Sequence, residues 1–178
     1  FFVLSGYLIG QILWQQWPDF NRSRLWRFWQ RRWLRTVPNY LLFLLLNIAI
    51  WRWTLGAWPD AWLHLGFLQN WAWPAALFFP ESWSLAVEEW FYLLAPLALL
   101  LFKGKRDPRL WLVLIALVIL ACGGARLVLA WHSTLSWDAG FKKMVLLRLD
   151  AIAYGLALVV LMPWLLRRRT PVSYTHLR

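Results

Sequence analysis

The sequence predicts an all-α protein that is embedded in a membrane as a polytopic helical bundle with about five transmembrane segments. Hydrophobic residues make up 61% of the 178 residues, charged residues only 15%, and the mean hydropathy is +0.50, which is far from an ordinary soluble domain. The chain contains 17 tryptophans, and indole rings are enriched where lipid meets water. Apolar runs alternate with short basic blocks, so each run is expected to cross the membrane.

The net charge of +11 comes from these basic blocks, which favour membrane topology over binding to nucleic acid. The blocks at 22–35, 103–109 and 167–169 fall on one side if the segments alternate. The positive-inside rule makes that side the cytoplasm. The lone Cys122 excludes an intrachain disulfide and a thiolate metal cluster, and no two histidines are paired at helical spacing, so no metal site is predicted.

Residues 1–14 form the first apolar run, which is too short for a complete crossing. Its length gives about 21 Å of helix, whereas a hydrocarbon core needs ~30 Å, and no initiator Met precedes it. We therefore expect a piece of a longer protein, with the first turns of this helix missing. Gly6 and Gly10 are expected to form a small-residue face for helix packing.

Residues 22–35 interleave arginines with aromatic and aliphatic residues, which predicts an amphipathic helix at the cytoplasmic interface. Topology and anionic lipid by themselves would explain much of this charge. Pro38 is expected to begin a membrane helix that runs to Trp53. The glycines and prolines of 54–81 predict an extracytoplasmic or re-entrant segment with one short helix, where His64 is expected to be a satisfied interfacial histidine.

Three further apolar runs predict membrane helices at about 85–102, 109–131 and 144–166. The tail 171–178 matches nothing before it, and we expect it to be an artefact. The membrane domain is therefore predicted to span residues 1–170.

Arg126 is unusual within an apolar helix. It could extend to the nearer membrane face, or it could face the bundle interior opposite Glu88, Glu89 or Asp150. Arg148 and Asp150 are two residues apart and do not face each other on a helix, so each is expected to need a partner elsewhere in the bundle.

Residues 81–96 place three of the eight acidic residues at the start of a predicted membrane helix. One explanation is structural: Ser82 or Ser84 caps the helix, and Glu88 and Glu89 lie in its first turns, where the helix dipole favours anions. The other explanation is functional, because a charge so near lipid usually faces a partner, a water-filled cavity or a substrate. The spacing alone leaves both explanations open.

Three stretches resemble the signature of acyltransferase family 3, the polytopic membrane O-acyltransferases that modify bacterial glycans and other acceptors. They are WSLAVEEWFYLLAP at 83–96, FFVLSGYLI at 1–9 and FWQRRWLRTVPNY at 28–40, and RLDAIAYG at 148–155 is a weaker match. The resemblance implies that a first transmembrane helix, carrying the catalytic histidine of the family, lies upstream of residue 1. Neither His64 nor His132 matches that position.

The resemblance also implies a reaction, its substrates and a location. An acyl group, expected to be acetyl, moves from acyl-coenzyme A to a hydroxyl of a glycan or related cell-envelope acceptor, in the inner membrane of a bacterium. No permanently bound cofactor is expected. Arg31, Arg32 and Arg35 would bind the phosphates of coenzyme A, since Arg32 and Arg35 share a helical face and can grip a phosphate through paired hydrogen bonds. Ser84 and Glu88 would line the path to the acceptor or orient a base.

Two other classes of function remain open. A transporter or flippase would use Arg126, Glu88 and Asp150 as an intramembrane relay, although the sequence contains no second copy of any motif, as an inverted repeat would require. A purely structural membrane subunit would tolerate replacement of all the arginines in 31–35.

Overall fold

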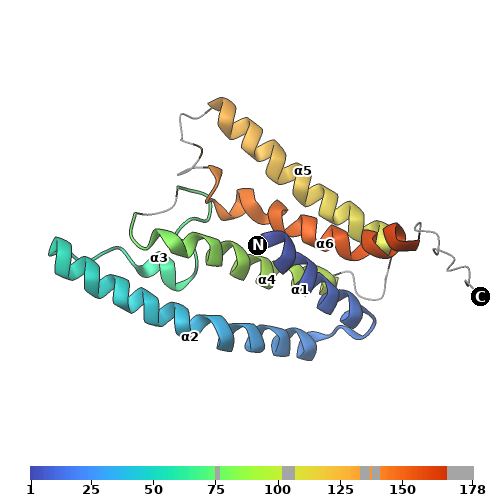
Figure 1. The fold of residues 1–178 in the computed structure, drawn as a ribbon, viewed down its shortest axis with the longest axis horizontal. Coiled ribbons are helices and arrows are strands. Elements are labelled where there is room, and N and C mark those ends of the chain that lie inside the picture. Colours follow the sequence, from blue (N-terminus) through green and yellow to red (C-terminus); the bar gives the residue numbers. More distant parts are fainter. Residues whose placement is uncertain (75–76, 102–106, 133–136, 138–140, 168–178) are drawn as a thin grey trace, which may run out of the picture.

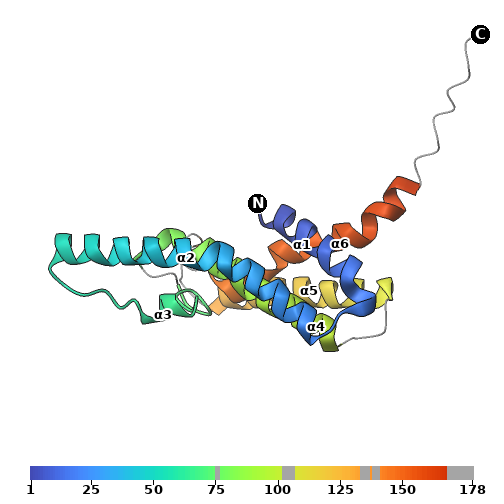
Figure 2. The ribbon, with the colours of Figure 1, turned by 90° about the horizontal axis from the view of Figure 1, so that it is seen from below.

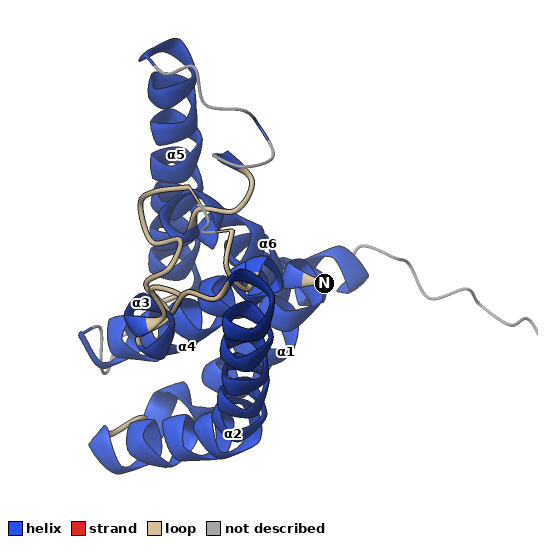
Figure 3. Ribbon diagram, turned by 90° about the vertical axis from the view of Figure 1, so that its left-hand side faces the viewer, coloured by secondary structure: helices blue, strands red, loops and turns tan. Residues whose placement is uncertain are grey.

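The computed structural model describes residues 1–74, 77–101, 107–132, 137 and 141–167, and within these ranges it contains helices and no strands. Figures 1 and 3 show the arrangement: α5 and α2 lie on opposite sides of the molecule, with α4 and α6 between them. The predicted all-helical fold is confirmed. The helices are α1 (Phe2–Gln16), α2 (Arg22–Leu55), α3 (Trp62–Leu65), α4 (Trp83–Leu101), α5 (Pro108–His132) and α6 (Val145–Arg167), with single 3-10 turns at Trp17–Asp19 and Pro80–Ser82.

Helices α1 and α6 approach each other closely because glycines line their contact. A methyl group added to Gly6 would clash with the Ile152 carbonyl, and one added to Gly155 would clash with the Val3 carbonyl. Small residues allow two membrane helices to pack backbone against backbone. The predicted packing role of Gly6 is confirmed, and this contact fixes where α1 lies against the rest of the bundle.

Helix α2 is one continuous helix of 34 residues, about 51 Å long. The Asn21 side chain accepts a hydrogen bond from the Arg24 N–H at 3.0 Å at its start, and Gly56, with φ +69°, ends it. The prediction that Pro38 begins a new helix was wrong. Proline removes one hydrogen bond but does not end a helix whose neighbouring turns stay bonded, and Pro38 lies inside α2.

Helix α4 lies at the centre of the bundle. It begins at Trp83, two residues before the predicted start. Its Ala86 and Val87 side chains are fully buried. One apolar cluster joins α4 to four other helices through residues such as Leu13, Leu25, Val87, Ile115 and Ile152, so any polar group on the buried faces of α4 lies inside the protein.

The segment between α2 and α4 folds back onto the helices. The predicted short helix is confirmed as α3, and the Tyr40 hydroxyl of α2 donates to the His64 carbonyl at 3.0 Å. His64 is buried within the protein, with 1% of its surface exposed, and its expected place at the membrane interface stays a prediction. Its Nε2 lies 3.2 Å from the Phe78 carbonyl, while Nδ1 has no partner in the part of the chain that the structure describes. Asn70 joins this segment to the start of α6, because its carbonyl accepts from the Val145 N–H at 2.8 Å.

Three helices of the described chain are long and apolar enough to cross a membrane: α2, α5 and residues 145–164 of α6. For α1 and α4, a membrane crossing remains a prediction from the sequence. Figures 1 and 2 show that α1, α4 and α6 end, and α2 and α5 begin, at one end of the bundle, which we call the basic end. The predicted alternation of the segments agrees with this arrangement. The predicted basic residues at 103, 105, 106, 168 and 169, and the tail 171–178, lie outside the described residues.

Candidate active site

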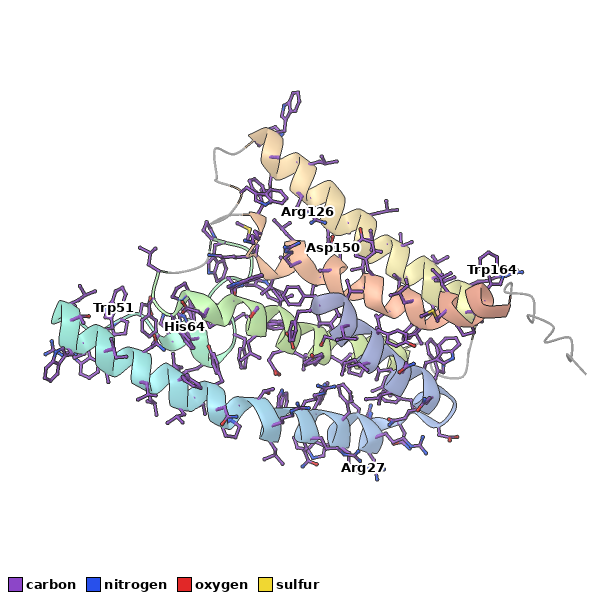
Figure 4. The ribbon with its side chains drawn as sticks, viewed as in Figure 1. Arg27, Trp51, His64, Arg126, Asp150 and Trp164 are labelled. Atoms are coloured by element: carbon purple, nitrogen blue, oxygen red, sulfur yellow. The ribbon has the colours of Figure 1, made fainter. Side chains whose placement is uncertain are left out.

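Five arginines of α2 line a pocket of about 320 Å³ at the basic end. Because they follow one another at intervals of one, three or four residues, they gather on one side of the helix. Ile12 and Gln16 of α1 form the opposite wall. Figure 4 shows Arg27 on this part of α2. The structure places the three predicted residues together and adds two that were not predicted: Arg24, Arg27, Arg31, Arg32 and Arg35.

The charge of this pocket is largely unneutralised. Among the described residues, Arg24 alone of the five has a carboxylate within ion-pair distance, the exposed Asp19 at 3.5 Å. The guanidinium of Arg32 lies over the ring of Tyr92 on α4, with 4.8 Å between its Cζ and the ring centroid. Such a cation–π contact orients the side chain without cancelling its charge. The pocket therefore offers several guanidinium groups to an anion, and phosphate is the anion that such forked donors fit.

Glu88 lies beside this pocket, buried within the bundle. Its Oε2 accepts a hydrogen bond of 2.8 Å from the Tyr92 hydroxyl, one turn further along α4. The Tyr92 hydroxyl in turn lies 2.5 Å from the Ser5 Oγ of α1. Since the tyrosine proton is donated to Glu88, the serine hydroxyl donates to the tyrosine oxygen. These three side chains form a continuous chain, the Glu88 network, which joins α1 to α4.

Glu89 points to a different helix. Its Oε1 accepts a hydrogen bond of 2.8 Å from Thr36 Oγ1 of α2. Its Oε2 is buried and has no partner among the described residues. A buried acceptor without a donor is costly, and in a native protein it is often completed by a ligand or water. Successive carboxylates of α4 thus contact α1 through the Glu88 network and α2 through Thr36.

The structural explanation of these carboxylates by helix capping is wrong. α4 begins at Trp83, so Glu88 and Glu89 lie beyond its first turn, where the effect of the helix dipole has faded. Ser82 is used elsewhere: its hydroxyl donates to the Phe79 carbonyl at 2.8 Å and accepts from Gln69 Nε2 at 3.1 Å. Ser84 is half-buried one turn before Glu88, and its predicted catalytic role stays a prediction.

Arg126 faces the bundle interior and pairs with Asp150 of α6, as one of the two alternatives predicted (Figure 4). Arg148 does not share this pair, because its Nε donates to the Lys142 carbonyl at 2.9 Å. The proposed relay of Arg126, Asp150 and Glu88 is not joined by hydrogen bonds among the described residues. Glu88 belongs to the network with Tyr92, and Asp150 to the ion pair.

Four polar residues of this site were not singled out from the sequence as site residues. Tyr92 and Glu89 stand in the same motif as Glu88, and the spacing of four between Glu88 and Tyr92 could have signalled their contact. Ser5 is 87 positions away from Tyr92, and Thr36 is 53 positions away from Glu89. No pattern in a single sequence connects positions so far apart.

Comparisons with known proteins show the family to which the chain belongs. The family model described as "Acyltransferase domain" matches residues 1–172. The peptidoglycan O-acetyltransferase OatA of Listeria monocytogenes is 32% identical over 137 residues, which is 65% of this chain and 21% of that protein. The O-acetyltransferase OatA of Staphylococcus aureus strain NCTC 8325 is 31% identical over 127 residues, 61% of this chain and 21% of that protein.

A putative O-acetyltransferase of Staphylococcus aureus strain COL is 29% identical over 146 residues, 69% of this chain and 23% of that protein. This chain therefore spans about a fifth of the length of the curated relatives it matches. No solved structure matches it. The family model covers nearly the whole sequence, and the motifs around Arg32 and Glu88 are those whose side chains meet in the structure. The chain belongs to acyltransferase family 3.

Proposed function

We propose that this chain is part of a membrane O-acyltransferase that moves an acyl group, acetyl in the first instance, from acyl-coenzyme A to a hydroxyl of a cell-envelope glycan. The observation that carries the proposal is the arginine pocket lying directly beside the buried Glu88 network. Membership of the family and the names of the relatives support the type of reaction.

The donor would bind at the arginine pocket. Coenzyme A is a polyanion, and Arg31, Arg32 and Arg35 provide forked donors at the basic end of the bundle. Arg24 and Arg27 extend the same surface. Under the positive-inside rule the basic end faces the cytoplasm of the bacterium, where the donor is made, and the membrane is the inner one.

Transfer to a hydroxyl requires a group that takes up its proton and a site that stabilises the oxyanion. The acceptor oxygen forms an ester bond to the acyl carbon, the thioester C–S bond breaks, and coenzyme A leaves as the thiol. In this proposal Glu88 orients the base or lines the path of the acceptor, with Ser84 one turn away. Tyr92 holds the carboxylate in one position by donating to it.

Binding of acetyl-coenzyme A to the complete protein tests the donor site, measured by calorimetry at low and high salt. Arg32→Ala and Arg35→Ala should each weaken binding about tenfold at low salt, since each removes a charge-assisted contact to phosphate. The difference should shrink at high salt. Arg22→Ala is the matched control, because Arg22 is an exposed arginine of the same helix that does not line the pocket. Unchanged binding by both pocket variants would leave the arginines with a role in topology alone.

A further inference from the structure

A second open pocket lies along α2, beyond the arginine pocket. It has a volume of about 410 Å³ and lies between the middle of α2 and the residues that lead into α4, and we call it the α2 groove. Arg35 lines both the α2 groove and the arginine pocket. Thr36, which donates to Glu89, lines the groove as well. The groove is therefore linked to α4 through the Thr36 hydroxyl, whereas Glu89 itself lines a different pocket.

Aromatic rings form one part of its wall. The rings of Tyr40 and Phe79 are stacked, with centroids 5.8 Å apart and an angle of 21° between their planes. Tyr40 is held in place by the hydrogen bond from its hydroxyl to His64. Phe79 has φ +50°, a conformation that costs a residue with a side chain of order 1 kcal/mol or more and persists only where the surroundings impose it. Phe43 is more than half exposed on the same wall.

Polar groups without partners form the rest of the wall. Asn39 and Glu81 are both exposed there, and the described residues give neither side chain a hydrogen bond or an ion pair. Arg35 and Glu81 have opposite charges, yet they do not pair, unlike Arg24 and Asp19. An amide, a carboxylate and a guanidinium are thus available to a ligand beside an aromatic surface.

The position of the groove separates it from the donor site along the membrane normal. Glu81 lies two residues before α4, whose 19 residues run for about 28 Å from there to the basic end. That length approaches the ~30 Å of a hydrocarbon core. The arginine pocket begins at the basic end, whereas the α2 groove opens toward the opposite membrane face, with Glu88 and Glu89 in between.

We propose that the α2 groove binds a sugar ring of the acceptor. This assignment rests on the proposed function and names the place of its second substrate. The apolar C–H face of a sugar would stack on Phe79 and Phe43, while its hydroxyls would bond with Asn39 and Glu81. Sites that bind small ligands usually combine an aromatic or apolar surface with a small number of polar groups that orient the ligand. A hydroxyl bound here would lie beside Thr36, whose own hydroxyl bonds to Glu89.

Binding of an N-acetylglucosamine tetrasaccharide to the complete protein in lipid nanodiscs tests the assignment, with saturation-transfer NMR and calorimetry as readouts. Asn39→Ala and Glu81→Gln should each weaken binding at least fivefold and leave acetyl-coenzyme A binding unchanged. Asn47→Ala and Asp60→Asn are the matched controls and should bind the sugar as the unaltered protein does. Asn47 bonds to its own helix and Asp60 lies in the loop, and neither lines the groove.

Two results would contradict the assignment of the α2 groove as a sugar site. One is that both variants bind the sugar as strongly as the unaltered protein, and the other is that the unaltered protein does not bind the sugar. The transfer reaction separates this failure from failure of the proposed function. If Asn39→Ala and Glu81→Gln transfer acyl groups to a sugar with the acceptor KM of the unaltered protein, the sugar site in the α2 groove is refuted while the proposed acyltransferase function stands. Weakened sugar binding in those variants, without acyl transfer by the unaltered protein, would refute the function and keep the sugar site.

Discussion

Two buried carboxylates of this bundle are held in different ways. Asp150 of α6 pairs with the guanidinium of Arg126, so its charge is neutralised by a direct partner. Glu88 of α4 is held by the hydroxyl of Tyr92, which is itself bonded to Ser5, and the guanidinium of Arg32 lies over the tyrosine ring. Both carboxylates are buried, with 3% and 8% of their surfaces exposed.

Under the proposed function, this difference would separate a structural charge from a functional one. A buried ion pair fixes two helices to each other, and here the positive charge of Arg126 faces Asp150 directly, although Asp150 Oδ1 has no partner among the described residues. A buried carboxylate bonded to neutral hydroxyl groups keeps its charge available, and this one lies beside an open cationic pocket. The Arg126–Asp150 pair joins α5 to α6, and in the proposed function the Glu88 network would serve the reaction.

Replacement of Glu88 should have the largest effect on activity. Glu88→Gln keeps the shape and still accepts the bond from Tyr92, but it removes the charge. Acyl transfer by the complete protein should fall at least about a hundredfold, with a melting temperature close to that of the unaltered protein. Asp60→Asn, an exposed acid of the loop, is the control and should keep full activity. Full activity of the Glu88→Gln protein would contradict a role of the Glu88 carboxylate in the reaction.

Loss of Asp150 should have the largest effect on stability. Asp150→Ala leaves Arg126 without its partner inside the bundle, and breaking a buried pair in this way costs about 3–5 kcal/mol. The yield of folded protein and its melting temperature in detergent measure this loss. Asp60→Ala is the control, because Asp60 is an exposed acid of the loop. Equal melting temperatures for the two variants would contradict a structural role of the pair.

Disturbing the contact of α1 with α6 tests how the Glu88 network is held. Gly155→Leu places a side chain against the backbone of α1 and should destabilise the protein by about 1–3 kcal/mol. Since α1 carries Ser5, acyl transfer should fall with it. Gly124→Leu is the control, because nothing lies within 4 Å of a methyl group added there. Activity that survives a full displacement of α1 would show that Ser5 is not needed in the network.

A single hydroxyl tests the network with a smaller change. Tyr92→Phe keeps the ring beneath Arg32 but removes the hydrogen bonds to Glu88 and Ser5. We expect a loss of about 1 kcal/mol in stability and about a tenfold lower rate of transfer. Tyr154→Phe, at an exposed tyrosine of α6, should change neither. Equal stability and equal transfer rates for the two tyrosine variants would contradict a role of the Tyr92 hydroxyl in the Glu88 network.

His64 belongs to neither carboxylate network and should give the smallest effect. Burial lowers the pKa of its imidazole below the ordinary value of 6.5, so the folded protein holds fewer protons there than the unfolded chain. The contribution of His64 is fully present above about pH 6.5 and is lost as the pH falls toward the lower folded pKa. The melting temperature of the unaltered protein should therefore fall as the pH is lowered from 8 to 5. This dependence on pH should be weaker in His64→Asn and unchanged in His132→Asn.

The sequence predicted those features that depend on spacing along one helix. The arginines of α2 were expected on one face, and three of them lie in one pocket because intervals of three and four residues return to the same side. Gly6 was expected in a close helix contact, because only small residues permit one. The short helix of the loop also follows from local pattern. The pairing of Arg126 with an acid was one of two alternatives that the sequence left open, and the structure decides between them.

Features that depend on which helices are neighbours were not predicted. The bond between Ser5 and Tyr92 and the bond between Thr36 and Glu89 both require the packing of distant segments. Pro38 misled the prediction, because a proline in a sequence usually marks a boundary, whereas the flanking turns of α2 continue the helix through it. The burial of His64 follows from the loop folding onto Tyr40, which no local pattern indicates.

The most direct test of the central claim is the acyl-transfer rate per folded molecule of a neutral pair, Arg126→Gln combined with Asp150→Asn, in the complete protein. Two amides can keep a hydrogen bond between α5 and α6 while both charges are absent. If the Arg126–Asp150 pair is structural, the folded double variant should transfer acyl groups within about threefold of the unaltered rate. A folded but inactive double variant would contradict the account, because it would place Asp150 in the reaction together with Glu88.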